Sequence, residues 1–291
     1  MPLLTVLFVS CQGTTPQKTV VLTFDDSVKS QAAFVAPLLK KHGFSATFFI
    51  TEGFSFKSRK DLYMSWKEIK ELHDQGFEIG NHTKRHRKVT QMTPQEFHES
   101  LEFIEKKCLK FGITKPVTFC YPAYATSRQA QIVLKERGYK FARAGGSRVS
   151  QPQKDTHLRL PQAFDSKPAS TFEQFKTAVD KADADNIPII TFHGVPDIEH
   201  PWVNTEQQNF VKYMNYLKEH NFKVIPLRDY PVKRVENLLK YWIFLDEIHY
   251  HIQKIGGMKP WSFYDSSTFA VKVQDFPTNK YYRPRSSLLS A

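Results

Sequence analysis

The sequence predicts an α/β fold in which a parallel β-sheet or barrel is surrounded by helices. Between residue 20 and about residue 230, short runs rich in β-branched and aromatic residues alternate with segments of helical periodicity. Four of the helical segments end at a glycine, the usual residue after a helix. The chain has 291 residues, 41% of them hydrophobic, which suffices for one large domain of this kind or for two small ones.

Seven strands are expected from the apolar runs. They are residues 20–24, 46–50, 77–80, 117–120, 139–142, 188–192 and 223–226. Runs that are apolar throughout are typical of strands covered on both faces.

Five helices are expected between these strands. They are residues 31–42, 66–75, 94–111, 127–137 and 205–220. Thr93 followed by Pro94 predicts an N-cap and a first helical position. From Val232 onward the pattern has no clear period, although residues 241–245 fit a last strand or helical segment.

The chain therefore divides into three parts, residues 1–17, 18–231 and 232–291. The first part is an apolar run that ends at Cys11 and is followed by a polar spacer, which resembles the end of a bacterial lipoprotein signal. This interpretation predicts export, with the protein periplasmic or attached to the cell envelope by a lipid on Cys11. The alternative is a buried first strand. We assign no function to the last part.

Cysteine and charge narrow the function further. The three cysteines, Cys11, Cys108 and Cys120, form no CxxC pair, so neither a disulfide framework nor a thiolate zinc site is indicated. The formal net charge is +12, and the basic residues are spread along the chain. Such a charge favours polyanions such as acidic glycans, membrane surfaces or nucleic acid without identifying which. No nucleic-acid partner is expected, because the basic clusters form only a weak motif.

Two motifs carry metal-binding side chains. Asp25 and Asp26 follow the first strand, and His82 and His86 follow the third, four positions apart in a helix or turn. Two imidazoles and one carboxylate can hold zinc or a similar ion with an open position for water, whose pKa falls toward about 7. Only one aspartate is needed as ligand, so Asp26 can bind the ion while Asp25 accepts a proton. The alternative for the aspartates is a helix N-cap.

All chemically interesting residues fall at the carboxyl ends of predicted strands. His193 follows the apolar strand 188–192, where it is either part of the site or a core histidine. In a barrel these ends share one face, on which active sites are usually built.

Four motifs in order resemble those of the polysaccharide deacetylases that share the nodulation-factor deacetylase domain. They are Thr-Phe-Asp-Asp at residues 23–26, His-Thr-Lys-Arg-His at 82–86, Phe-Cys-Tyr-Pro at 119–122 and Thr-Phe-His-Gly at 191–194. The resemblance covers residues 18–230. It implies a distorted (β/α) barrel with about seven parallel strands, a divalent metal that is commonly zinc, and hydrolysis of N- or O-acetyl groups on a glycan.

The resemblance also implies roles for single residues. Asp25 matches the catalytic base and His193 the general acid, whereas Asp26, His82 and His86 match the metal ligands. This agrees with the chemistry inferred from the residues, in which a backbone N–H and the ion stabilise the oxyanion.

Two departures from the family pattern affect the third and fourth motifs. Cys120 and Ala123 stand where the family usually has Arg and Tyr, as in a subset that carries Tyr-Pro and places an arginine on the following strand. We hypothesise that Arg143 is that arginine and pairs with Asp25. The supporting Asp-Trp pair has no match, and Asp165 is only a remote candidate whose simpler interpretation is a capping or loop aspartate.

Substrate contacts are expected beside the motifs. We assign them to Tyr121, Pro122, Tyr124 and Trp202, whose rings can stack on sugars. Two other functions remain open: a catalytically impaired relative that binds glycans, and a hydrolase of a small non-sugar amide on the same barrel.

Overall fold

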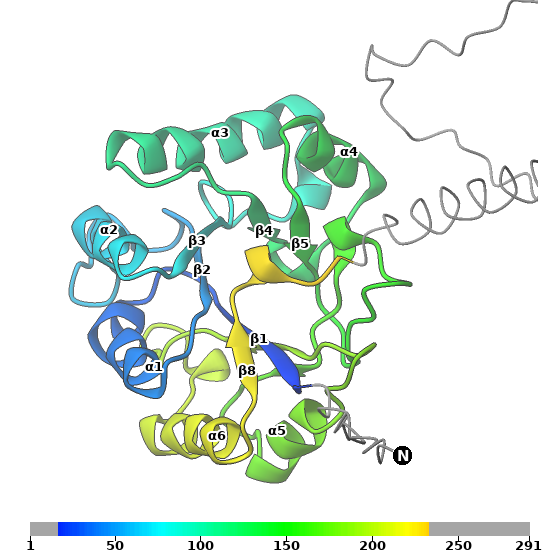
Figure 1. Ribbon diagram of the computed structural model, residues 1–291. Coiled ribbons are helices and arrows are strands. Elements are labelled where there is room, and N and C mark those ends of the chain that lie inside the picture. The colour runs from blue at the N-terminus through cyan, green and yellow to red at the C-terminus, as the bar shows by residue number, and fades with distance from the viewer. Residues whose placement is uncertain (1–16, 233–291) are drawn as a thin grey trace, which may run out of the picture. The chain divides into compact units, whose positions relative to one another are not determined.

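The computed structural model describes residues 17–232 (Figure 1). The leader with Cys11, residues 241–245 and the C-terminal part, about which the sequence makes predictions, lie outside the described residues. Within residues 17–232, no helix combines the length and the apolar character that a membrane crossing requires.

The core of the fold is a curved sheet of eight parallel strands encircled by helices (Figure 1). The strands are β1 (Thr19–Phe24), β2 (Thr47–Ile50), β3 (Glu78–Asn81), β4 (Thr118–Cys120), β5 (Phe141–Arg143), β6 (Phe164–Asp165), β7 (Ile189–Phe192) and β8 (Lys223–Ile225). The distorted (β/α) barrel expected from the sequence is confirmed.

Seven strands follow one path, β5-β4-β3-β2-β1-β7-β6, and β8 pairs with β1 beside it. β8 pairs with the first half of β1, where Val20 lies opposite Val224, while β2 pairs with the second half, where Phe24 lies opposite Phe48. The chain before β6 closes the circle, because Leu160 bridges to Arg143 of β5 and Phe164 pairs with Ile190 of β7.

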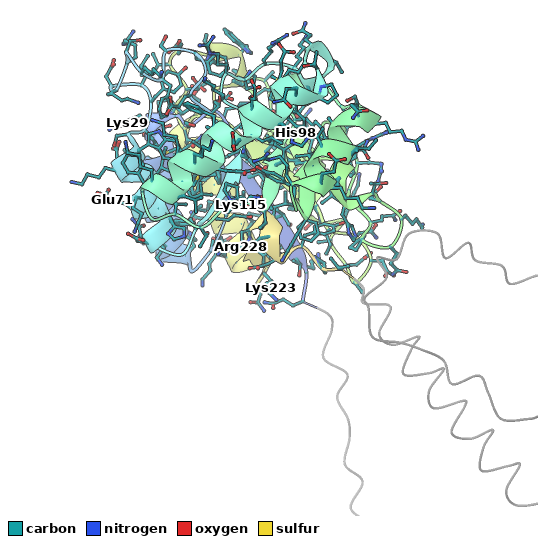
Figure 2. All side chains as sticks on the ribbon, turned by 90° about the horizontal axis from the view of Figure 1, so that it is seen from above. Lys29, Glu71, His98, Lys115, Lys223 and Arg228 are labelled. Atoms are coloured by element: carbon teal, nitrogen blue, oxygen red, sulfur yellow. The ribbon has the colours of Figure 1, made fainter. Side chains whose placement is uncertain are left out.

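The helices are α1 (Ala36–His42), α2 (Trp66–Asp74), α3 (Pro94–Lys110), α4 (Arg128–Glu136), α5 (Phe172–Val179) and α6 (Gln207–Glu219), with a π-helical turn, Gln31–Val35, in front of α1. Thr93 caps α3 as predicted, since its hydroxyl accepts the Glu96 amide proton and the Glu96 carboxylate accepts that of Thr93. Polar and charged side chains cover the outside, among them His98 on α3, and Lys223 and Arg228 near the amino-terminal end of the strands (Figure 2).

The sequence analysis missed β6 and α5. β6 has two residues, too few for a periodic pattern. α5 does carry a usable signal, because Thr171 and Gln174 form a capping box at its start.

Aromatic side chains between the strands and α6 pack β1 against its two neighbours, β2 and β7. The Phe24 ring stacks on Phe48 at 5.0 Å and on Phe192 at 5.4 Å between centroids, and all three are fully buried. Phe210 of α6 meets the edge of Phe24 at 5.9 Å. This cluster ties β1 to both neighbouring strands, so the residues that follow Phe24 and Phe192 are held in fixed positions.

Candidate active site and metal centre

The carboxyl ends of five strands bring the predicted site residues together. Asp25 follows β1, His82 follows β3, Arg143 ends β5, Asp165 ends β6 and His193 follows β7. All five are buried or nearly so.

Asp26, His82 and His86 form a group that can hold a metal ion. Asp26 Oδ1 lies 3.4 Å from His82 Nε2 and 3.4 Å from His86 Nε2, and the three ligand atoms lie within 4.8 Å of one another. Asp26 Oδ1 is buried without a hydrogen-bond partner among residues 17–232. A buried carboxylate oxygen facing two imidazole nitrogens suits a divalent cation such as zinc.

The imidazole of His82 is oriented for this task. Its Nδ1–H donates to the Cys120 carbonyl oxygen at 2.8 Å, which leaves Nε2 to face Asp26. Burial alone would lower the pKa of His82, but Cys120 and the carboxylates of Asp26 and Asp25 outweigh it and raise that pKa. A proton and a cation therefore compete for the same nitrogen.

The segment between the two histidines is a loop. The helical alternative is wrong, because Thr83 and His86 have positive φ angles of 67° and 52°. Asn81 holds the loop: its Oδ1 accepts the Thr83 amide proton at 2.9 Å, and its amide group donates to Tyr139 at 2.7 Å. A Cβ on Gly53 would lie 3.0 Å from His86 Cβ, so glycine there allows the loop to pack closely.

Asp25 faces the same space from β1. Arg143 Nη2 donates to its Oδ2, and the Cys120 thiol lies 3.5 Å from that oxygen, whereas Oδ1 is buried without a partner among the described residues. Burial would raise the pKa of Asp25, but Arg143 and then the site histidines outweigh it and lower that pKa. The carboxylate is therefore ionised at neutral pH.

The N-cap interpretation of the two aspartates is wrong. Helical residues begin only at Lys29 and the π-helical turn at Gln31, so neither aspartate stands directly before a helix. Instead, Asp26 and Ser27 adopt positive φ angles of 72° and 60°, a costly conformation for residues other than glycine. As a result of this turn, Asp25 contacts Arg143 whereas Asp26 faces His82 and His86.

Arg143 is fully buried, and only its Nε lacks a hydrogen-bond partner among residues 17–232. Its Nη1 donates to Gln162 Oε1 at 2.7 Å, and its guanidinium lies 5.6 Å from the Tyr124 ring centroid. Gln162 Oε1 also accepts the Thr191 hydroxyl proton at 2.8 Å. The structure thus joins β5 to β7 behind Asp25, through a glutamine that no sequence pattern indicated.

His193 lies opposite the metal-ligand group. Its Nε2 is 3.9 Å from Asp25 Oδ2 and 4.0 Å from Asp26 Oδ2. Its Nδ1 is 4.0 Å from Asp165 Oδ1, and neither atom has a hydrogen-bond partner among residues 17–232. Asp165, a remote candidate in the sequence, therefore lies where a carboxylate can orient the imidazole. The buried Gln31 amide, missed by the sequence analysis, donates to the backbone oxygens of both Asp25 and His193.

A cavity of about 440 Å³ is lined by the metal-ligand group and by Asp25, Asp165 and His193. Of the predicted substrate contacts, Tyr124 and Trp202 line it, and Trp202 is 65% exposed. Tyr121 also borders it but is fully buried, with its hydroxyl donating to the Leu158 carbonyl, so neither its ring nor its hydroxyl is available to a ligand. Pro122 is buried at the start of the turn Pro122–Tyr124 and does not line the cavity.

Phe54 and His200 also line the cavity, although no sequence motif contains them. Phe54 lies 4.7 Å from the His86 ring and 4.4 Å from the His200 ring, between centroids. A second cavity of about 710 Å³ shares Tyr124, Asp165 and Lys167 with the first and extends along α5.

Comparisons with known proteins agree with this architecture. Residues 12–142 match the family model of polysaccharide deacetylases, a range that ends before Arg143 and His193. The peptidoglycan-N-acetylmuramic acid deacetylase of Bacillus subtilis is 33% identical over 125 residues, 43% of this chain and 44% of the relative, so the match spans less than half of that protein.

Two solved structures share the fold. The Xyl-CE4 domain of a multidomain xylanase from the hindgut metagenome of Trinervitermes trinervoides superposes with a TM-score of 0.52 at 18% identity, over 73% of this chain and 89% of that domain. A family 4 acetyl xylan esterase from Clostridium thermocellum, solved with a cobalt ion, has a TM-score of 0.52 at 22% identity over the same shares.

Proposed function

We propose, because residues 12–142 of this chain belong to the polysaccharide deacetylase family, that the site hydrolyses N- or O-linked acetyl groups on a glycan. The observation that carries the proposal is the position of His193 Nε2, 3.9 Å from Asp25 and 4.0 Å from Asp26. A base, a metal ligand and an acid thus face one small space.

Asp25 and His193 divide the proton transfers. Asp25, kept ionised by Arg143, takes a proton from the attacking water through Oδ1, the oxygen that Arg143 leaves free. His193 gives a proton to the departing nitrogen or oxygen, and Asp165 orients its imidazole from the Nδ1 side. Arg143 touches no substrate and acts as a positioning residue.

Asp26, His82 and His86 would hold the metal ion, for which we propose zinc on the two-nitrogen, one-oxygen ligand set. When bound there, such an ion supplies Lewis-acid polarisation and acidifies water. The hydrogen bond from His82 Nδ1 to Cys120 keeps the ligand nitrogen in place.

The cavities support a sugar polymer or oligomer as substrate. The 440 Å³ cavity offers the exposed Trp202 for stacking, and the adjoining 710 Å³ cavity has polar walls that include Ser147, Gln174 and Lys181. The name of the Bacillus subtilis relative makes peptidoglycan the first glycan to test.

We further propose that the protein is exported and anchored by a lipid on Cys11, which fractionation of Cys11→Ala cells would test.

A screen for acetate release tests the function. Peptidoglycan, chitin oligomers and acetylated xylan are offered to the purified full chain loaded with zinc, with and without chelator. We expect acetate from at least one glycan and its loss in chelator. Release from none of them, together with chelator-sensitive hydrolysis of a small non-sugar amide, would replace this proposal with the amidase alternative.

A further inference from the structure

His200 lies in the wall of the catalytic cavity together with the three site histidines. It comes from the loop after β7 and is only 6% exposed, between the rings of Phe54 at 4.4 Å and Trp202 at 5.3 Å. Neither the metal-ligand group nor the proton transfers described above use it.

A buried carboxylate faces the imidazole of His200. Asp197, 3% exposed, has its Oδ1 3.4 Å from His200 Nδ1, and the same oxygen accepts the His200 backbone N–H at 2.9 Å. Asn204 Oδ1 in turn accepts the Asp197 amide proton at 2.8 Å. A Cβ on Gly194 would lie 2.6 Å from Asp197 Cα, so glycine allows the loop to fold back this closely after His193.

The pair Asp197–His200 repeats the arrangement of Asp165 and His193. In both, a carboxylate faces Nδ1 of an imidazole that lines the cavity. In both histidines Nδ1 is buried without a hydrogen-bond partner among the described residues. They differ in what Nε2 meets: His193 Nε2 lies within 4.0 Å of Asp25 and Asp26, whereas no carboxylate among residues 17–232 lies within 4.0 Å of His200 Nε2. His200 is therefore set back from the reacting groups.

The surroundings of His200 determine its protonation. Burial would lower its pKa, but Asp197, and after it Asp26 and Glu199, outweigh burial and raise that pKa. Because the Asp197 carboxylate faces Nδ1 and can only accept, the neutral ring carries its proton on Nδ1. Nε2 is then a hydrogen-bond acceptor in the neutral ring and a donor in the charged ring.

We propose that His200 is a substrate-positioning residue, whose Nε2 forms a hydrogen bond with a hydroxyl group of the sugar that stacks on Trp202. The proposal rests on the deacetylase function above. Stacking on an exposed aromatic ring supplies contact area but leaves the sugar free to rotate and slide, since every sugar ring has an apolar face. A fixed hydrogen-bonding nitrogen beside the ring selects one orientation, and so presents one acetyl group to Asp25 and His193.

Steady-state kinetics on the zinc-loaded full chain test this role. The substrates are the chitin tetramer and a peptidoglycan disaccharide fragment. His200→Leu, which keeps the volume and removes the hydrogen-bonding nitrogen, should raise KM about tenfold, the effect of one lost hydrogen bond, while kcat changes far less. His200→Gln, whose amide group can again form a hydrogen bond, should recover part of the loss.

Two further variants separate positioning from folding. Asp197→Asn should raise KM in the same direction by a smaller factor, and the double variant Asp197→Asn/His200→Leu should be no worse than His200→Leu, because the two residues act as one unit. Ile198→Ala, in the same loop at 71% exposure and outside the cavity lining, is the matched control and should leave KM unchanged.

Binding without turnover keeps the two proposals distinguishable. Calorimetric titration of the deacetylated tetramer and of the peptidoglycan fragment should show weaker binding to His200→Leu than to the unsubstituted protein. If the unsubstituted protein binds but releases no acetate, the deacetylase function fails, and the binding difference still tests His200. A fall in kcat at unchanged KM, or equal binding by both proteins, would overturn the positioning role.

Discussion

The carboxylate of Asp25 and the guanidinium of Arg143 form an ion pair almost sealed from solvent, with side chains 3% and 0% exposed. They are 118 residues apart in the chain and meet because β1 and β5 end on the same face. Cys120 of β4 lies beside the pair, with its thiol 3.5 Å from Asp25 Oδ2.

Arg143→Met should cost both activity and stability. Removing one partner of a buried ion pair typically destabilises a protein by about 3–5 kcal/mol, because the other charge stays buried. Denaturant unfolding measures that loss, and acetate release should fall at least tenfold at a temperature where the variant is folded. The double variant Asp25→Asn/Arg143→Met should recover part of the stability. Unchanged turnover in Arg143→Met would contradict its role in positioning Asp25.

Asp25 and Asp26 should respond differently to substitution. Asp26→Ala should lose the bound metal, since it removes the only carboxylate among the three ligands. Asp25→Asn should retain the metal and lose about 10²–10⁴-fold in turnover, the range of general acid–base catalysis. Elemental analysis of dialysed protein together with acetate release measures both. Similar metal content and turnover in the two variants would refute the division of roles.

Zinc should stabilise the fold. An ion present at about 100 times its dissociation constant adds about 2.7 kcal/mol, which for a domain of this size corresponds to a rise in Tm of roughly 5–10 °C. Thermal unfolding with zinc and with chelator measures the difference. In His82→Ala, zinc should have little effect, whereas His98→Ala, outside the ligand group, should respond as the unsubstituted protein does. A full zinc response in His82→Ala would exclude this site.

Glu105 should make the free energy of unfolding depend on pH in the acid range. Burial would raise its pKa, but Arg137, which donates to it at 2.6 and 3.1 Å, and then Tyr139 outweigh burial and lower that pKa. A lowered folded-state pKa means that this stability is complete above the unfolded value of about 4.3 and disappears as pH falls through the folded value. Arg137→Gln should therefore destabilise by about 1.5–3 kcal/mol at pH 7 and much less at pH 3, measured by urea unfolding. An equal loss at both pH values would assign the effect to packing.

Trp202 should contribute to glycan binding but not to the stability of the fold. Its ring is 65% exposed, so Trp202→Ala should leave the free energy of unfolding within about 0.5 kcal/mol of the original. Loss of stacking should raise KM for a glycan severalfold, in line with about 0.5–1.5 kcal/mol for an aromatic contact. Leu109→Ala, at 62% exposure on α3, is the control and should leave KM unchanged. A normal KM in Trp202→Ala would remove this residue from the substrate site.

Local signals predicted the long elements well. The seven strands and five helices expected between residues 18 and 231 are present, because apolar runs, glycines after helices and the Thr93 cap act over a few residues. β6 was missed because two residues carry no period, and yet it places Asp165 beside His193.

The sequence by itself determined which residue types stand at the strand ends, and hence the alternating α/β pattern and the candidates Asp25, Asp26, His82, His86 and His193. The pairing of Arg143 with Asp25 was a hypothesis of the sequence analysis, and only the tertiary structure decided the other partners. The contacts of Gln31 with the backbone oxygens of Asp25 and His193, and the approach of Asp197 to His200, depend on how a curved sheet brings distant strand ends together and on how one loop folds back. Local sequence encodes period and capping, whereas these contacts arise from the closure of the barrel, which no short segment contains.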